Sequence, residues 1–316
     1  MYEGFYSLTE RPFSLTPNPH YVFYSARYRQ AEDELLYGIS RKEGFMLLTG
    51  LPGTGKTTLC RELLDKLDPE KYRSALLFNP FLNGVEMLQA LLTEFRVPVP
   101  AGGSRNELLN ALNQFLLQEL AAGHICVAIF DEAQHMSTEF LEQIRVLSNL
   151  ETAEEKLIQI VLVGQPELLA RIKMPGMAQL NQRVSVRCSL THLNLDETKR
   201  YIYHRLDVAG AHGRVEFFNS AVKKIYRASQ GIPRRINAIS DQTLLAGYVD
   251  QTRKLGIRQV KKAVSSLEGD ESTPAPTMGL AARIALGVGA AAAIAGGATA
   301  VVLYRAGSLI LPRIMP

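Results

Sequence analysis

Residues 50–57 constrain the fold of this chain more than any other segment, because they read Gly-Leu-Pro-Gly-Thr-Gly-Lys-Thr and fit the pattern G-x-x-x-x-G-K-[S/T]. An apolar run at 45–49 precedes the loop and is typical of a buried strand, and residues 58–64 favour a helix directly after it. The glycines let the backbone curl so that successive N–H groups point inward, and the helix start adds the positive end of its dipole. The segment therefore predicts a phosphate-binding loop between a strand and a helix.

Two side chains of this loop are expected to have separate tasks. Lys56 should reach the β- and γ-phosphates of a nucleotide, and the Thr57 hydroxyl should hold magnesium. A glycine-rich turn that matches the pattern by chance is the alternative, and the flanking strand and helix argue against it. We expect ATP or GTP, with Mg²⁺, to contact these residues: Gly50, Pro52, Gly53, Thr54, Gly55, Lys56, Thr57 and Thr58.

An acidic pair follows a second apolar run, at 125–130, and reads Asp131-Glu132. Acidic residues at the end of a strand commonly lie on the magnesium side of phosphate-transfer sites, so Asp131 is predicted to hold the metal through water. Glu132 is predicted to polarise the attacking water, which requires a carboxylate within hydrogen-bond reach. Solvated acids at an ordinary strand end would be the favoured interpretation if the phosphate loop were not present.

The order of predicted elements indicates an α/β fold. Apolar runs typical of strands alternate with helical patterns, which points to a three-layer αβα arrangement around a parallel sheet. Ser104 and Glu107 have the spacing of a capping box and mark the start of one helix. The predicted strands are 45–49, 74–79, 125–130, 157–163 and 184–190, and residues 194–268 are expected to contain helices only.

The C-terminal segment 284–304 is uncharged over 21 residues, which is long enough to cross a bilayer as a helix. We therefore expect a single transmembrane helix there, and an Ala/Gly-rich tail that is disordered or lies on a surface is the alternative. The expected domains are an N-terminal arm (1–40), an α/β nucleotide-binding domain (41–192), a helical lid (193–268), a linker (269–283), the transmembrane helix (284–304) and a short tail (305–316).

Three polar residues outside the loop are further candidates for catalysis. Gln165 follows a predicted central strand, where its amide would touch the γ-phosphate or the attacking water. Arg183 stands at the edge of the last strand, from which an arginine can reach the nucleotide of a neighbouring subunit. Arg234 follows Pro233 at the start of a lid helix, where it would sense the γ-phosphate. Turn residues and solvated arginines are the ordinary interpretations of these positions.

Together these residues resemble the AAA+ ATPases, and more narrowly the ExeA/GspA-type (general secretion pathway protein A) ATPases, over roughly residues 1–265. The narrower resemblance is carried by the aromatic and proline-rich opening 2–19, by Asp131-Glu132-Ala133-Gln134, and by the motifs at 164–168 and 231–234. One departure is Tyr28, where this family commonly has histidine. The resemblance implies Walker, sensor and finger roles for Lys56, Thr57, Asp131, Glu132, Gln165, Arg183 and Arg234.

The same resemblance implies how the protein is used. Its members suggest ATP as the nucleotide, a homo-oligomer in which Arg183 acts in trans, and a single-pass location in the bacterial inner membrane with the ATPase domain in the cytoplasm. The expected partners are inner-membrane proteins of secretion, pilus or exopolysaccharide assembly.

Two hypotheses about function remain open at this point. The first is a membrane-anchored AAA+ ATPase that drives envelope or secretion machinery. The second is a DNA-associated ATPase of the transposition-helper kind, for which the net charge of +4 is neither required nor prohibitive. Nucleic acid is not the expected partner, because no DNA-binding motif is recognised and a membrane segment would be unusual for such a protein. A GTPase switch or small-molecule kinase is disfavoured, because no Asn-Lys-x-Asp motif for guanine is present and the expected helical lid with its arginines favours an AAA+ protein instead.

Overall fold

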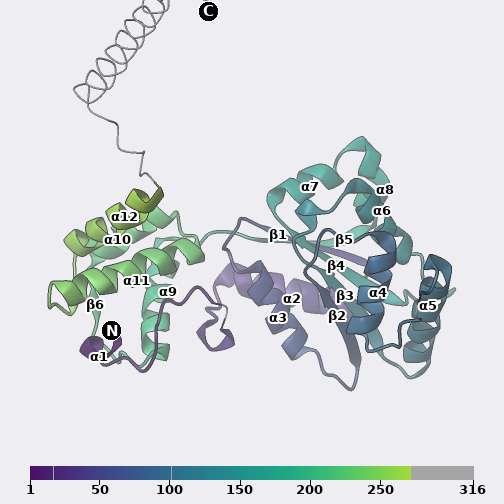
Figure 1. Ribbon diagram of the computed structural model, residues 1–316, viewed down its shortest axis with the longest axis horizontal. Coiled ribbons are helices and arrows are strands. Elements are labelled where there is room, and N and C mark those ends of the chain that lie inside the picture. The colour runs from purple at the N-terminus through teal and green to yellow at the C-terminus, as the bar shows by residue number, and fades with distance from the viewer. Residues whose placement is uncertain (17, 101, 272–316) are drawn as a thin grey trace, which may run out of the picture. The chain divides into compact units, whose positions relative to one another are not determined.

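The computed structural model describes residues 1–16, 18–100 and 102–271 (Figure 1). Residues Met1–Ser265 form one compact unit, and Ser266–Pro316 are assigned to a second. The expected transmembrane helix at 284–304 and the tail at 305–316 lie outside the described residues, as does most of the linker. Within the described part of the chain, no helix combines the length and the apolar character that a membrane span requires.

Five parallel strands form the central sheet in the order β2-β3-β4-β1-β5, which confirms the predicted α/β class with a parallel sheet. Strands β1, β3 and β4 are buried almost throughout, which explains their continuous apolar sequences. The edge strands β2 and β5 alternate in exposure instead. The bounds are β1 Phe45–Gly50, β2 Tyr72–Leu77, β3 Ile125–Phe130, β4 Ile158–Gly164 and β5 Val184–Leu190.

Helices cover both faces of this sheet, and Figure 1 shows the strands between the two groups. Along β1, Phe45 and Leu47 join one hydrophobic core while Met46 and Leu48 join the other, as successive residues of a strand must. The second core lies under α2 (Ala26–Ser40) and α3 (Lys56–Lys66). The first core lies under α4 (Gly84–Glu94), α5 (Arg105–Ala121), α6 (Thr138–Leu147), α7 (Pro166–Ile172) and α8 (Ala178–Arg183).

A capping box fixes the start of helix α5. The Ser104 hydroxyl accepts from the Glu107 N–H, and the Glu107 carboxylate accepts from the Ser104 N–H, so the predicted capping box is confirmed at α5. Three short 3₁₀ helices complete this part of the chain: η1 (Pro19–Tyr21), η2 (Ala133–His135) and η3 (Pro175–Met177).

The lid region contains α9 (Leu195–Val208), α10 (Asn219–Ser229) and α11 (Pro233–Val249), and α12 (Ile257–Glu271) follows. The expectation of helices alone was wrong at two places. Strands β6 (Glu216–Phe217) and β7 (Lys254–Leu255) pair in parallel and join the loops on either side of the α10–α11 pair. A pairing of two residues is too short to produce a period in the sequence, so pattern analysis does not detect it.

The N-terminal arm packs on the lid helices, and Figure 1 shows its short helix α1 (Glu3–Tyr6) beside them. The Tyr6 hydroxyl donates to the Leu244 carbonyl oxygen at 2.9 Å, and the Thr9 N–H donates to the Ala209 carbonyl oxygen at 2.9 Å. At Gly247 an added Cβ would lie 2.4 Å from the Tyr6 hydroxyl oxygen, so only glycine leaves room for this ring. The arm is thus a strap that runs along the lid before it enters α2.

Arg205 of α9 is the buried cation that fastens this strap, with 6% of its surface exposed. Its Nε donates to the Pro12 carbonyl oxygen at 2.5 Å, and its Nη1 donates to the Tyr201 hydroxyl at 3.0 Å. The guanidinium also lies over the Tyr21 ring, 4.5 Å from the centroid. Hydrogen bonds and an aromatic face therefore replace the carboxylate partner that a buried arginine commonly has.

Replacing Arg205 with alanine should destabilise the protein by about 2–3 kcal/mol, because a charge-assisted bond is lost and the Pro12 carbonyl is left buried. Urea unfolding followed by circular dichroism measures this change. Arg200→Ala on the same helix is the matched control, since its exposed pair with Asp196 should contribute about 0.5 kcal/mol or less. If both substitutions lowered the free energy of unfolding by the same amount, the conclusion that Arg205 fastens the arm to the lid would be wrong.

Candidate nucleotide-binding site

The sheet order brings the phosphate loop, the acidic pair and Gln165 to one edge. The carboxyl ends of parallel strands meet at the same edge, and in open α/β sheets ligands bind there. The phosphate loop follows β1, Asp131 follows β3, and Gln165 follows β4. Because β4 lies between β1 and β3, Gln165 is positioned between the loop and the acidic pair.

The loop has the curled backbone that its glycines predict. Gly53 and Gly55 adopt φ angles of +79° and +101°, in the left-handed region that favours glycine. A Cβ on Gly50 would lie 2.9 Å from both the Leu190 carbonyl oxygen and Thr54 Oγ1, so this position also excludes a side chain. Helix α3 begins at Lys56, which places its first N–H groups at the loop.

Lys56 is buried at the base of the loop, with 6% of its surface exposed. Its Nζ donates to the Gly50 carbonyl oxygen at 2.8 Å and to the Leu51 carbonyl oxygen at 3.2 Å. Burial lowers the pKa of the Lys56 ammonium, and the nearby carboxylates of Glu132 and Asp131 oppose that shift. These two carboxylates therefore favour the charged ammonium that phosphate binding requires.

Thr57 and Asp131, the two predicted metal residues, are in direct contact. The Thr57 hydroxyl donates to Asp131 Oδ2 at 2.6 Å, and Asp131 itself is only 1% exposed. The other carboxylate oxygen, Oδ1, accepts from the Glu132 N–H at 2.8 Å. A hydroxyl and a carboxylate side by side are oxygen ligands of the kind that Mg²⁺ prefers, so these residues fit the expected ion.

Glu132 turns toward the same site through an unusual backbone conformation. Its φ of 55° and ψ of 31° lie in the left-handed region, where residues other than glycine are uncommon. The side chain is 43% exposed, and Oε2 accepts from Gln134 Nε2 at 2.5 Å. Backbone strain of this kind is often found at functional sites.

A cavity of about 510 Å³ brings most of the candidate residues together. Pro52 to Thr58, Glu132, Gln165 and Arg234 all line it, whereas Gly50 and Asp131 are not among its described lining residues, although Asp131 accepts from Thr57. Arg183 is not among the described residues that line this cavity. The other walls come from the arm, the end of β5 and the lid, including Ser14, Tyr21, Val22, Phe23, Tyr28, Leu190, Leu193, Tyr201, Arg205 and Asn237.

The lid helix α11 starts directly on the phosphate loop. The Arg234 N–H donates to the Gly53 carbonyl oxygen at 3.3 Å, and a Cβ on Gly53 would lie 2.7 Å from Arg234 Cβ. Gly231 precedes this helix with a φ of +73°, and an added Cβ would overlap the Leu193 carbonyl oxygen at 2.0 Å. Glycine at position 53 therefore permits the close approach of the lid to the loop, and glycine at position 231 permits the turn that packs against Leu193 before α11 begins.

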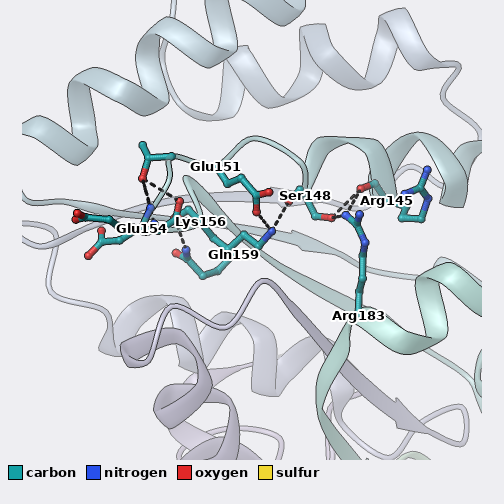
Figure 2. Close-up of polar contacts among 9 residues, drawn as sticks. Arg145, Ser148, Glu151, Glu154, Lys156, Gln159 and Arg183 are labelled. Atoms are coloured by element: carbon teal, nitrogen blue, oxygen red, sulfur yellow. Dashed lines mark hydrogen bonds and ion pairs between the residues drawn. The ribbon is translucent and has the colours of Figure 1, made fainter.

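Arg183 occupies a separate place at the end of α8, and Figure 2 shows its guanidinium pointing to the end of α6. Nη1 donates to Ser148 Oγ at 2.5 Å and to the Arg145 carbonyl oxygen at 3.3 Å. Lys156 donates to the Ser148 carbonyl oxygen at 3.2 Å and pairs with Glu151. Arg183 is thus held by a polar cluster instead of extending freely into solvent.

Sequence reasoning missed the contribution of the arm to the cavity. Tyr21, Val22 and Phe23 line it although they precede the phosphate loop by about thirty residues. Tyr28 also lines it and is 7% exposed, and its hydroxyl has no hydrogen-bond partner among the described residues. The sequence did show that aromatic residues are frequent in the opening segment. This frequency indicates that the segment packs on another part of the protein, but it does not indicate which part.

Comparisons with known proteins indicate which kind of domain contains this cavity. A family model described as an AAA domain matches residues 39–172. General secretion pathway protein A of Aeromonas hydrophila is 40% identical over 275 residues, which are 86% of this chain and 50% of that protein. The chain carries an AAA domain. It spans about half the length of the curated relative that it matches.

Solved structures show the same fold at low sequence identity. Cdc6p of Pyrobaculum aerophilum has a TM-score of 0.63 at 18% identity, with 83% of this AAA+ chain and 74% of that chain covered. The ORC2 protein of Aeropyrum pernix has a TM-score of 0.60 at 17% identity, with 84% and 75% covered. The RuvB branch migration motor of Thermotoga maritima has a TM-score of 0.51 at 18% identity, with 81% and 72% covered.

Lys56→Ala should weaken binding of Mg²⁺–ATP by about tenfold or more, because a charge-assisted bond to phosphate is typically worth about 1.5–3 kcal/mol. Isothermal titration with a slowly hydrolysed ATP analogue measures this affinity. Lys71→Ala is the matched control, since Lys71 is 72% exposed near Asp68 and lies beyond the end of α3. An unchanged affinity in Lys56→Ala would contradict the assignment of the loop.

Proposed function

We propose that this chain binds ATP with Mg²⁺ and hydrolyses it to drive the assembly or operation of secretion or other envelope machinery at the bacterial inner membrane. The observation that supports hydrolysis most strongly is the Thr57–Asp131 contact at 2.6 Å beside the buried Lys56, with Glu132 and Gln165 on the same cavity. The secretion role is supported by the 40% identity to general secretion pathway protein A. The proposed partners are inner-membrane proteins of secretion, pilus or exopolysaccharide assembly.

The loop and the acidic pair have complementary tasks in this proposal. The N–H groups of the loop and Lys56 bind the β- and γ-phosphates, while Thr57 and Asp131 hold Mg²⁺. When bound, the metal neutralises charge on the phosphate oxygens. Glu132 orients a water molecule for attack on the γ-phosphorus and accepts its proton as the bond to the β,γ-bridging oxygen breaks, which yields ADP and phosphate.

Two residues sense the γ-phosphate from different elements. Gln165 caps α7 at the end of β4 and makes no side-chain capping bond, so its amide is available to the cavity that it lines. Arg234 reaches the cavity from the start of α11, which rests on Gly53 of the loop. Loss of the γ-phosphate would therefore remove one contact at the end of β4 and one at the start of the lid helix α11.

Arg183 is proposed to act on the nucleotide of a neighbouring subunit in a homo-oligomer. In its own chain it lies outside the nucleotide cavity and is held by Ser148 and the Arg145 carbonyl (Figure 2). A guanidinium that is already oriented loses little freedom when it meets a phosphate, and arginine fingers increase turnover by large factors.

Glu132→Gln and Arg183→Ala should each lower ATP turnover by about 100-fold or more, because one lacks the base and the other lacks the finger. An equimolar mixture should recover turnover far above either variant alone, since the Arg183→Ala subunit keeps an intact base and its Glu132→Gln neighbour supplies the finger. Phosphate release measures both effects, and Arg187→Ala, whose exposed side chain donates to Asn181, is the matched control. Normal turnover in Arg183→Ala would contradict a finger in trans.

Residues 284–304 are proposed to anchor the ATPase domain to the cytoplasmic side of the membrane as one span. The full chain should therefore stay in the membrane pellet after carbonate extraction. Ile294→Arg places a charge at the middle of this segment and should cost about 2.5–3.5 kcal/mol of insertion, moving part of the protein to the supernatant. Recovery of the unaltered chain in the supernatant would contradict the anchor.

A further inference from the structure

Gln134 uses both ends of its side-chain amide to join the ends of two strands. It lies in η2, directly after the acidic pair that follows β3. Its Nε2 donates to Glu132 Oε2 at 2.5 Å, and its Oε1 accepts from the backbone N–H of Gln165 at 3.0 Å. One half-buried side chain therefore contacts the proposed base at the end of β3 and the proposed γ-phosphate sensor at the end of β4.

Two further observations indicate that this amide has a fixed place. The backbone carbonyl oxygen of Gln134 accepts from Arg171 Nη1 at 2.9 Å, which ties η2 to α7. At Gly164, the last residue of β4, an added Cβ would lie 2.9 Å from Gln134 Oε1 and 3.3 Å from its backbone nitrogen. Strand β4 thus ends in a glycine where the side-chain amide of Gln134 lies against the backbone.

The bridge has a direct consequence for the glutamate. A glutamate that is 43% exposed would sample several rotamers, and only some of them would direct a carboxylate oxygen to the water that attacks the nucleotide. An ionised carboxylate only accepts hydrogen bonds, so a donor at Oε2 fixes the group and leaves Oε1 to accept from water. His135 Nε2 lies 4.0 Å from the same Oε2, beyond hydrogen-bond distance, and does not replace the amide.

We propose that Gln134 is a positioning residue for ATP hydrolysis, which holds the Glu132 carboxylate in register with Gln165 through the hydrogen-bond bridge between β3 and β4. This inference rests on the proposed function, because Glu132 must be the base. The bridge also makes the position of the base depend on α7, whose first turn begins at the Gln165 cap. A displacement of α7 would then withdraw the carboxylate from its productive orientation without changing the phosphate loop.

Two substitutions separate the parts of the bridge. Gln134→Met has a similar length but neither donates nor accepts, so it removes both contacts. Gln134→Glu keeps an acceptor for the Gln165 N–H, which favours correct folding, but places a second carboxylate against Glu132. Gln118→Met, at an exposed position of α5, is the matched control for the glutamine-to-methionine change.

Turnover by the full chain and affinity for a slowly hydrolysed ATP analogue are measured for each variant. We expect kcat to fall by about 10–100-fold in both Gln134 variants, with the affinity within about twofold of the unaltered protein, because a carboxylate displaced by about 1 Å loses most of its effect. Gln134→Met added to Glu132→Gln should cause no further loss, since a positioning residue acts only through the group that it positions. Gln118→Met should leave both quantities unchanged.

The outcomes distinguish this inference from the function on which it rests. Normal turnover in Glu132→Gln would overturn the proposed function itself. If Glu132→Gln is impaired, three results would overturn the positioning role alone: kcat within twofold of normal in the Gln134 variants, an affinity that falls in parallel with kcat, or losses that multiply in the double variant. The last two results would indicate a general structural contribution of Gln134.

Discussion

The hydrogen bond between Thr57 and Asp131 joins the two halves on which the nucleotide site depends. One half is the loop after β1, and the other is the end of β3, which lies two strands away because β4 runs between them. The site is therefore built from three strand ends, since the residue that follows β4 must lie between the phosphate loop and the acidic pair. The strand order therefore positions Lys56, Gln165 and Glu132 around one cavity.

Sequence predicted the sheet well where strands are buried on both faces. The bounds of β3 agree with the predicted 125–130, because its apolar run begins and ends with the strand. The prediction of 74–79 for β2 began and ended two residues late, because the strand is Tyr72–Leu77 and the apolar Phe78, which is 45% exposed, follows it. The β6–β7 pair was not predictable, because two residues carry no period and their partners are far apart in sequence.

In the site, too, contiguous motifs could be predicted from the sequence, whereas contacts between distant residues could not. The phosphate loop and the acidic pair are each contiguous, and local residue types indicate their chemistry. The arm residues Tyr21 to Phe23 line the cavity, and contacts distant in sequence, such as those of Arg205 and Tyr6, hold the arm on the lid. Gln134 was visible as part of a motif, but its bridge to Gln165 depends on the pairing of β3 with β4 and requires the folded chain.

We infer that Glu132 completes a composite hydrolytic site and that nucleotide binding does not depend on this residue. Loading the protein with radiolabelled Mg²⁺–ATP, removing free nucleotide by gel filtration and identifying the bound species tests this claim directly. We expect the Glu132→Gln variant to retain intact ATP, whereas the unaltered protein should hold ADP. Conversion of bound ATP to ADP at the same rate in both proteins would contradict it.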